Sequence, residues 1–110
     1  MILDSRDILH KGLRRLWQSG GSDKRGISVS WSKALCDILL HLHSARSLND
    51  IYAGLGMLKN LKQLSGHAHR YSMEVNANWR ITFNCIDPDT GIVTDIDLED
   101  LHRPGGARRH

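Results

Sequence analysis

The sequence predicts an α+β domain in which helices come first and an antiparallel sheet follows. In the first half of the chain, hydrophobic residues recur at the spacing of amphipathic helices, over residues 10–18 and 31–46. In the second half they alternate with polar residues, over 71–76, 79–85 and 92–99, which is the pattern of half-buried strands. Turn-forming segments separate these three stretches, so we expect them to form a meander.

The first expected helix covers residues 10–18. Its apolar residues recur at i, i+3 and i+4, and its cations lie opposite them: Leu13, Leu16 and Trp17 against Lys11, Arg14 and Arg15. Gly20-Gly21 ends the helix. Before it, Ile2-Leu3 and Ile8-Leu9 predict a short strand.

The second expected helix is the longest element and runs to about Arg46. Its apolar stripe at helical spacing consists of Trp31, Leu35, Ile38, Leu42 and Ala45. Ser30 or Ser32 is the expected cap at its start. Leu39 and Leu40 widen the apolar surface, so we expect the sheet to cover one side and the first helix or a partner protein the other. Residues 48–52 predict one further helical turn.

Two turns join the three expected strands. Asn76-Ala77-Asn78 is rich in residues that tolerate positive φ and predicts a hairpin. Asp87 to Gly91 predicts the second turn. Residues 103–110 contain three arginines, two glycines and a proline but no large apolar residue, so we expect a disordered basic tail behind a single domain of residues 1–102.

Composition limits the classes of function. With 110 residues the chain has room for one domain, and its net charge of +3 favours polyanionic partners only weakly. Charged residues near the start argue against a signal peptide, so we expect none, and no apolar run approaches the roughly 20 residues of a membrane span. Cys36 and Cys85 lie in apolar runs without metal-type spacing. We therefore expect a cytoplasmic protein with reduced core thiols.

The hairpin carries a more specific signal. Residues 71–83, with the sequence YSMEVNANWRITF, resemble the signature hairpin of HigB toxins in the RelE/ParE superfamily. Leu61 to Gly66 is similar to the family's loop before that hairpin, and residues 95–102 are similar to its terminal strand, which ends in an Asp-x-His. His10-Lys11-Gly12-Leu13 also fits, so the resemblance covers about residues 7–102.

This resemblance implies both a fold and a function. The fold has two N-terminal helices packed on a twisted antiparallel sheet of three to four strands, which agrees with the expected order of elements. The function is that of a toxin in a type II toxin-antitoxin system: a ribosome-dependent, metal-independent endoribonuclease that cleaves mRNA and inhibits translation without a cofactor. The implied partners are the ribosome, mRNA and a HigA-like helix-turn-helix antitoxin, with DNA contacted only through the antitoxin and no membrane involved.

Two other functions stay open. A ParE-like protein would inhibit DNA gyrase by binding, without cleaving RNA, and an attenuated toxin would act mainly as the regulatory partner of its antitoxin. Departures from the family keep these alternatives open: Lys62 stands where many HigB toxins carry a histidine, and Ser65 where they carry a lysine. Leu101 replaces the usual tyrosine, which removes a hydroxyl and an aromatic platform for base stacking.

Metal-free RNA cleavage requires deprotonation of the ribose 2′-hydroxyl, stabilisation of charge at the phosphate and protonation of the leaving 5′-oxygen. His102 matches the family's terminal histidine and is the expected proton-transfer group. Asp100 matches the acid two positions before it and is expected to orient a basic group. Arg80 falls on the polar face of a central strand, where its guanidinium is expected to hold a phosphate. The alternative for Arg80 is a cross-strand pair with Asp95 or Asp97.

Further RNA-binding residues are expected around the loop before the hairpin. Lys59, Lys62 and Arg70 are expected to contact phosphates, and His67, with His69 beside it, is placed to replace lost imidazole function. No third ligand accompanies this His-x-His pair, so we do not expect a metal site. The tryptophans occupy core-facing positions and are expected to pack rather than to stack on bases: Trp17, Trp31 and Trp79.

Overall fold

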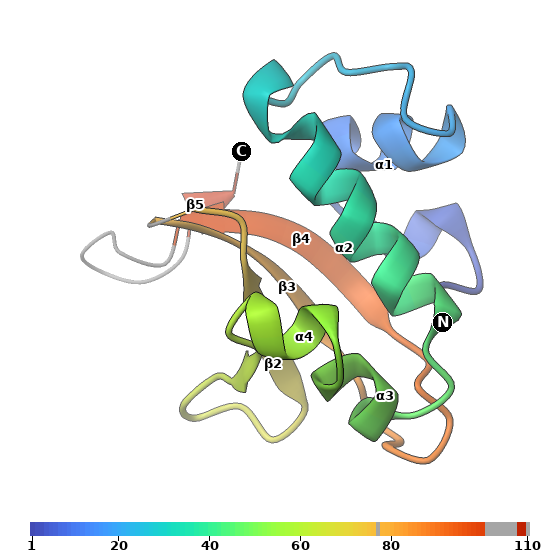
Figure 1. The fold of residues 1–110 in the computed structure, drawn as a ribbon, viewed down its shortest axis with the longest axis vertical. Coiled ribbons are helices and arrows are strands. Elements are labelled where there is room, and N and C mark those ends of the chain that lie inside the picture. The colour runs from blue at the N-terminus through green and yellow to red at the C-terminus, as the bar shows by residue number, and fades with distance from the viewer. Residues whose placement is uncertain (77, 101–107, 110) are drawn as a thin grey trace.

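The computed structural model describes residues 1–76 and 78–100, and the backbone of 108–109. Helices come first: η1 (Ser5–Asp7), α1 (Lys11–Gln18), η2 (Val29–Trp31), α2 (Ser32–Ser44), α3 (Leu48–Tyr52) and α4 (Leu55–Leu58), where η marks a 3-10 turn. The strands follow: β1 (Lys62–Gln63), β2 (Arg70–Glu74), β3 (Trp79–Asn84), β4 (Thr94–Asp100) and β5 (Arg108–Arg109). They form one curved antiparallel sheet in chain order (Figure 1). The predicted α+β class, its two N-terminal helices and its three long strands are confirmed.

Helix α1 is amphipathic, as predicted. Leu13 and Leu16 are buried, whereas Lys11 at its start is exposed. His10 caps the helix, because its Nδ1 accepts the Leu13 N–H at 3.1 Å. After the helix the chain turns through Gly20 and Gly21, both with positive φ, so α1 ends where the sequence predicts.

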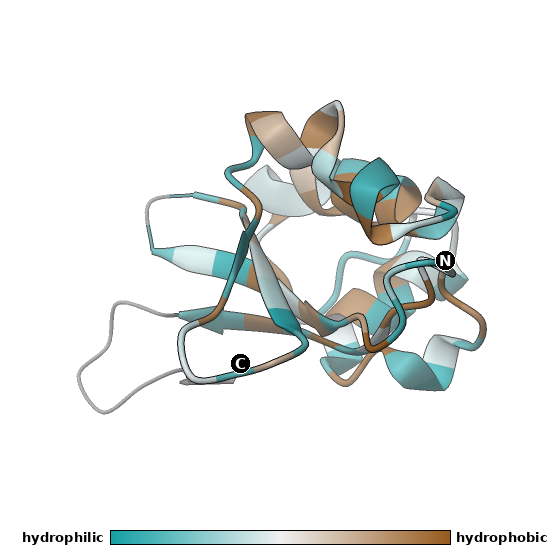
Figure 2. Cartoon of the chain, turned by 90° about the horizontal axis from the view of Figure 1, so that it is seen from below, coloured by the Kyte–Doolittle hydropathy of each residue, from teal (hydrophilic) through white to brown (hydrophobic). Residues whose placement is uncertain are grey.

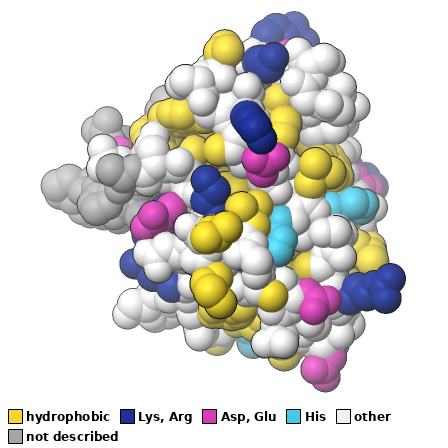
Figure 3. Space-filling model, viewed as in Figure 1, with side chains coloured by type: hydrophobic (Ala, Val, Ile, Leu, Met, Phe, Trp, Pro, Cys, Tyr) yellow, Lys and Arg dark blue, Asp and Glu magenta, His cyan; other side chains and the backbone are white. Residues whose placement is uncertain are grey.

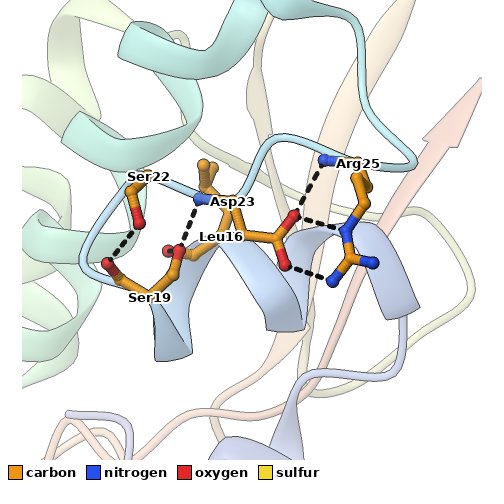
Figure 4. A network of polar contacts seen from close by, with 5 residues as sticks. All are labelled: Leu16, Ser19, Ser22, Asp23 and Arg25. Carbon is orange, nitrogen blue, oxygen red and sulfur yellow. Dashed lines mark hydrogen bonds and ion pairs between the residues drawn. The ribbon is translucent and has the colours of Figure 1, made fainter.

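Short-range polar contacts hold the loop after α1 (Figure 4). The Ser19 hydroxyl donates to the Leu16 carbonyl and accepts the Asp23 N–H, and the Ser22 hydroxyl donates to the Ser19 carbonyl. The Asp23 carboxylate accepts two hydrogen bonds from the Arg25 guanidinium, at 2.9 and 2.7 Å. These side-chain bonds lower the pKa of Asp23 from its usual 3.8 to about 2.

The same loop returns to α1 at Gly26. A Cβ placed on Gly12 would lie 2.7 Å from the carbonyl carbon of Gly26, closer than such atoms approach one another. Glycine at position 12 therefore allows the loop backbone to lie directly on the helix backbone. This contact anchors a loop that has few apolar side chains of its own.

Helix α2 packs its predicted stripe into the core. Leu35, Ile38, Leu39 and Leu42 are fully buried. Leu40 is 57% exposed, so only one member of the widened apolar surface remains open among the described residues. The predicted serine cap is wrong: η2 leads directly into the helix, and the Ser32 hydroxyl donates to the Val29 carbonyl instead.

The two ends of the described chain differ from the predictions. In place of the predicted first strand, the chain forms η1 and then one parallel bridge from Ile8 to Ile96. Residues 108–109 were expected in a disordered tail, but their backbone pairs with Glu99 and Asp100 of β4. The rest of the predicted tail and Ala77 of the predicted turn lie outside the described residues.

The middle of the chain agrees more closely. Helix α3 is the predicted turn over 48–52, whereas α4, a single turn beside two glycines, was not predicted. Strand β4 begins at Thr94 rather than at Ile92. Asp95 has a φ of +49° and marks a β-bulge, because the register with β3 shifts between Thr82 and Asn84.

The core lies between the helices and one face of the sheet. Figure 2 shows hydrophobic stretches in both layers. The fully buried side chains include Leu35, Ile38 and Leu42 from α2 and Met73, Ile81 and Phe83 from the sheet. The three tryptophans pack against this core, as predicted, with the rings of Trp31 and Trp79 5.7 Å apart. Cys85 is buried and Cys36 half-buried, and neither thiol is paired with the other.

Candidate functional site

The sheet face that points away from the core carries polar side chains in three rows. Strand register sets the rows, because residues opposite one another on antiparallel strands point to the same side. The rows are Arg70 and Asn84; Ser72, Thr82 and Asp97; and Glu74, Arg80 and Glu99. Lys62 of β1 lies in register with Ser72 and so belongs to this side as well. We call these residues the outer face.

The outer face is polar, as the alternation predicts, but its centre is closed to solvent. Ser72 and Thr82 are 0% exposed, and Arg80 is 8% exposed. The description of these strands as half-buried is therefore wrong at their centre, where both faces are covered. A buried polar group is tolerated when hydrogen bonds replace its lost hydration, so the partners of each arginine decide what that arginine is able to do.

Arg70 is the centre of one polar network. Its Nη2 donates to the Thr82 hydroxyl at 2.7 Å, and that hydroxyl donates to Glu99 at 2.6 Å. Its Nη1 donates to the Asp95 carbonyl at 2.7 Å and to the Asn84 side chain at 3.2 Å. The network therefore joins β2, β3 and the bulge of β4 through one guanidinium.

Arg80 is the centre of a second, smaller network. Its Nη1 donates to the Ser72 hydroxyl at 3.0 Å, and its Nη2 forms an ion pair with Glu74 at 2.9 Å. The cross-strand partner is thus Glu74 on β2, and the predicted alternative of Asp95 or Asp97 on β4 is wrong. These two partners fix the orientation of the guanidinium, and the Glu74 carboxylate occupies the position that an oxyanion would take.

Asp100 lies on the other side of the sheet from Arg80. It stands in register with Trp79, whose ring packs against Trp31 on the helix side. Asp100 is 8% exposed. The predicted catalytic residues Arg80 and Asp100 therefore do not share a face, and Asp100 is not placed to touch a phosphate at Arg80. His102 and Leu101 lie outside the described residues.

The predicted RNA-binding residues are dispersed rather than clustered. Lys62 is exposed on the edge strand, and Lys59 is half-buried, with its carbonyl accepting the Glu74 N–H at 2.8 Å. His67 and His69 are exposed in the connection between β1 and β2. Of these four residues, register joins Lys62 to the outer face.

The charges of the outer face nearly cancel. Among the described residues it carries three cations, Lys62, Arg70 and Arg80, and four carboxylates, Glu74, Asp95, Asp97 and Glu99. Asp95 is included because its carboxylate accepts from the Asn84 side chain at 2.8 Å. The face therefore does not attract polyanions by its net charge, and binding there depends on specific contacts.

A groove between α1 and α2 is a second candidate site, and it includes Leu39 and Leu40, where the sequence predicts cover by the first helix or a partner protein. It has a volume of about 250 Å³ and is lined by Leu16, Trp17, Gly20, Gly21, Cys36, Leu39 and Leu40. Burial, and then the nearby Asp37 carboxylate, raise the pKa of the Cys36 thiol, which therefore behaves as an apolar wall. Figure 3 shows hydrophobic side chains over α2 and α4, where Leu40, Met57 and Leu58 are exposed.

Among the described residues, no group of three or more His, Cys, Asp or Glu side chains is placed to hold a metal ion. Within the same residues, no helix is long and apolar enough to cross a membrane.

Comparisons with known proteins add no family assignment. A scan of the sequence against protein-family models found no match, and a search of the curated proteins found none either.

Proposed function

We propose that the protein is a HigB-like toxin of the RelE/ParE superfamily, a ribosome-dependent endoribonuclease that cleaves mRNA and inhibits translation. The observation that carries the proposal is the shared position of Lys62 and Arg80 on the outer face, which is formed largely by the two strands of the hairpin whose sequence resembles the family's signature. Two N-terminal helices on an antiparallel sheet are the architecture that this resemblance implies.

In this proposal Arg80 stabilises the charge that develops on the phosphate. Its guanidinium is nearly buried and Ser72 fixes its orientation, so the cation itself does not have to move when an oxyanion replaces Glu74. Lys62 on the exposed edge strand contacts a neighbouring phosphate as a point charge. His102 transfers the proton. Asp100, on the opposite side of the sheet, acts as a positioning residue for the end of β4 rather than as a contact to RNA.

The near-neutral charge of the outer face supports a reaction that depends on the ribosome. Three cations beside four carboxylates give too little attraction to hold free RNA, so the ribosome has to present the mRNA. The test is to incubate purified toxin with a defined mRNA, with and without translating ribosomes, and to map new 5′ ends. We expect the toxin to cleave the mRNA only when translating ribosomes are present. Efficient cutting of naked mRNA would contradict the ribosome dependence.

A second function, inhibition of DNA gyrase by binding as in ParE-like proteins, is favoured by a different observation. Arg80 and Asp100 lie on opposite sides of the sheet, so the described residues do not assemble a complete cleavage site. Transcripts that stay intact with ribosomes present, together with inhibited supercoiling by purified gyrase, would establish this second function. If the protein shows neither mRNA cleavage nor gyrase inhibition, the attenuated toxin is the remaining function. A gain of cleavage in Leu101→Tyr would then identify a weakened nuclease.

A HigA-like helix-turn-helix antitoxin is the partner that we propose for the groove between α1 and α2. The segment 11–46 around it contains seven Lys or Arg and two Asp, so an acidic segment with an apolar side chain complements it. Leu40 is 57% exposed at this groove, and Leu40→Asp is therefore expected to weaken the complex without unfolding the toxin. Met57→Asp on α4 is the matched control. Hydrogen-exchange protection confined to β2 and β3 on adding antitoxin would contradict this placement.

A further inference from the structure

The two arginines of the outer face are held by different kinds of partner. Arg70 donates to a backbone carbonyl and to the side chains of Thr82 and Asn84, and its neighbour Glu99 is 3.9 Å away with a side chain 14% exposed. A ligand is unable to replace these partners without opening the sheet. Arg70 is therefore a brace of the fold.

Arg80 depends on one accessible carboxylate. Its own side chain is 9% exposed, but the side chain of Glu74, 2.9 Å away, is 41% exposed. The other partner, Ser72, is fully buried and holds the guanidinium from the side of the sheet. Glu74 is consequently the partner that an incoming anion is able to displace.

Two further hydrogen bonds, from residues on the side away from Arg80, hold Glu74 so that its carboxylate stays next to the Arg80 guanidinium. The Asn60 side-chain amide donates to the same oxygen, Oε1, at 3.0 Å. The Glu74 N–H donates to the Lys59 carbonyl at 2.8 Å. Both contacts come from the end of α4, so this short helix sets the position of the carboxylate.

We propose that Glu74 is an intramolecular competitor for an oxyanion site at Arg80. Its Oε1 occupies the place that a non-bridging phosphate oxygen takes in the bound state, because both accept the same charge-assisted hydrogen bond. A phosphate that binds displaces Glu74 into solvent, while Ser72 keeps its bond to Arg80. That the ligand is RNA rests on the proposed function. Competition between Glu74 and an anion for Arg80 does not depend on that function.

The experiment compares Glu74→Gln with Glu99→Gln, two substitutions that remove the same charge from the same face. Binding of inorganic phosphate and of a single-stranded RNA hexamer is measured at low salt, by NMR of the Arg80 side chain and by fluorescence anisotropy. We expect Glu74→Gln to bind both probes about twofold to fivefold more tightly, since a partly exposed ion pair competes by about that factor. Glu99→Gln should give a clearly smaller gain, because Glu99 lies opposite Arg80 but pairs with Thr82 and Arg70 and does not occupy the Arg80 guanidinium. Equal gains in both variants, or no gain in Glu74→Gln, would overturn the proposal.

A milder variant covers the case in which Glu74→Gln fails to fold. Asn60→Gly removes the amide behind Glu74, and glycine adopts the φ of +52° at this position without strain. It should give a smaller gain in phosphate binding, and an unchanged affinity would count against the proposal. Failure of mRNA cleavage on ribosomes, with these gains intact, would reject the nuclease function and leave the anion site standing.

Discussion

The helical half of the molecule, residues 11–46, and the sheet half, residues 62–100, carry opposite charges. The helical half has seven Lys or Arg and two Asp, whereas the sheet half has three Lys or Arg and seven Asp or Glu. Most cations of the helical half are exposed, while the two arginines of the sheet are held in polar networks. Long-range attraction for acidic partners therefore comes from the helices, and geometrically defined anion contacts come from the sheet.

In the proposed function, the helices bind an acidic protein partner and the outer face binds one phosphate that is presented in a fixed place. The difference in charge also predicts that substitutions in the two halves differ in kind: those in the sheet change activity or the polar network, and those in the helices change packing and protein association.

The largest expected effect is that of Arg80→Ala on activity. Loss of a preorganised cation at a developing phosphate charge lowers the rate by about a hundredfold or more, so growth inhibition should disappear. Stability should fall by about 1–2 kcal/mol, because Ser72 loses a charged partner while Glu74 is exposed enough to be hydrated. Growth assays at equal expression, combined with urea unfolding, measure both. Full toxicity of the variant would remove Arg80 from the mechanism.

Arg70→Ala should have the larger effect on stability. The substitution leaves Thr82, Asn84 and the Asp95 carbonyl without their shared donor, and we expect a loss of about 2–3 kcal/mol in the free energy of unfolding. Urea denaturation in parallel with Arg80→Ala tests the ranking. A smaller loss than that of Arg80→Ala would show that Arg70 does not brace the sheet.

In the helical half, Gly12→Ala should destabilise by packing alone. The new methyl would overlap the Gly26 backbone, and overpacking of this kind costs about 1–3 kcal/mol. Because no charge is involved, the loss should be the same in low and high salt, unlike the loss in Arg70→Ala. A salt-dependent loss in Gly12→Ala would weaken the distinction between the halves.

The smallest expected effect is the pH response of the loop after α1. Asp23 has its pKa lowered from 3.8 to about 2 by its hydrogen bonds from Arg25, so its contribution to stability is present above pH 3.8 and is lost as the pH falls through about 2. NMR titration of the carboxyl should give the low value in the parent and a higher value in Arg25→Ala, still below 3.8 because the backbone N–H of residue 25 keeps its bond to Asp23. Identical titrations in the two proteins would show that this pair does not form in solution.

Local periodicity predicted the helices well, because the core positions of α1 and α2 follow from spacing within one segment. It did not predict α4, since a single turn beside Gly54 and Gly56 has no periodic signal. The alternation over residues 92–99 also predicts that Ile92, and not Val93, faces the core together with Ile96 and Leu98. Val93 is fully buried and Ile92 is not, because the bulge at Asp95 shifts the alternation by one residue.

The candidate site was predictable in part. Alternation placed Arg80 on the polar face, and the same alternation placed Asp100 with Ile96 and Leu98 on the core side, which the resemblance to the toxin family obscured. The partner of Arg80 was not predictable. Arg80 pairs with Glu74 rather than with the carboxylates of β4 because of where these side chains lie across the sheet. The sequence of a single strand does not specify those positions.

The most direct test of the account compares Arg80→Lys with Arg70→Lys in ribosome-dependent mRNA cleavage, with rates normalised to the folded fraction. Both variants keep the charge and lose the planar fork. We predict that Arg80→Lys loses most of its cleavage rate while remaining folded, and that Arg70→Lys is less stable but cleaves normally once folded. Equal rates in the two folded variants, or a loss confined to Arg70→Lys, would contradict the assignment of Arg80 as the phosphate contact.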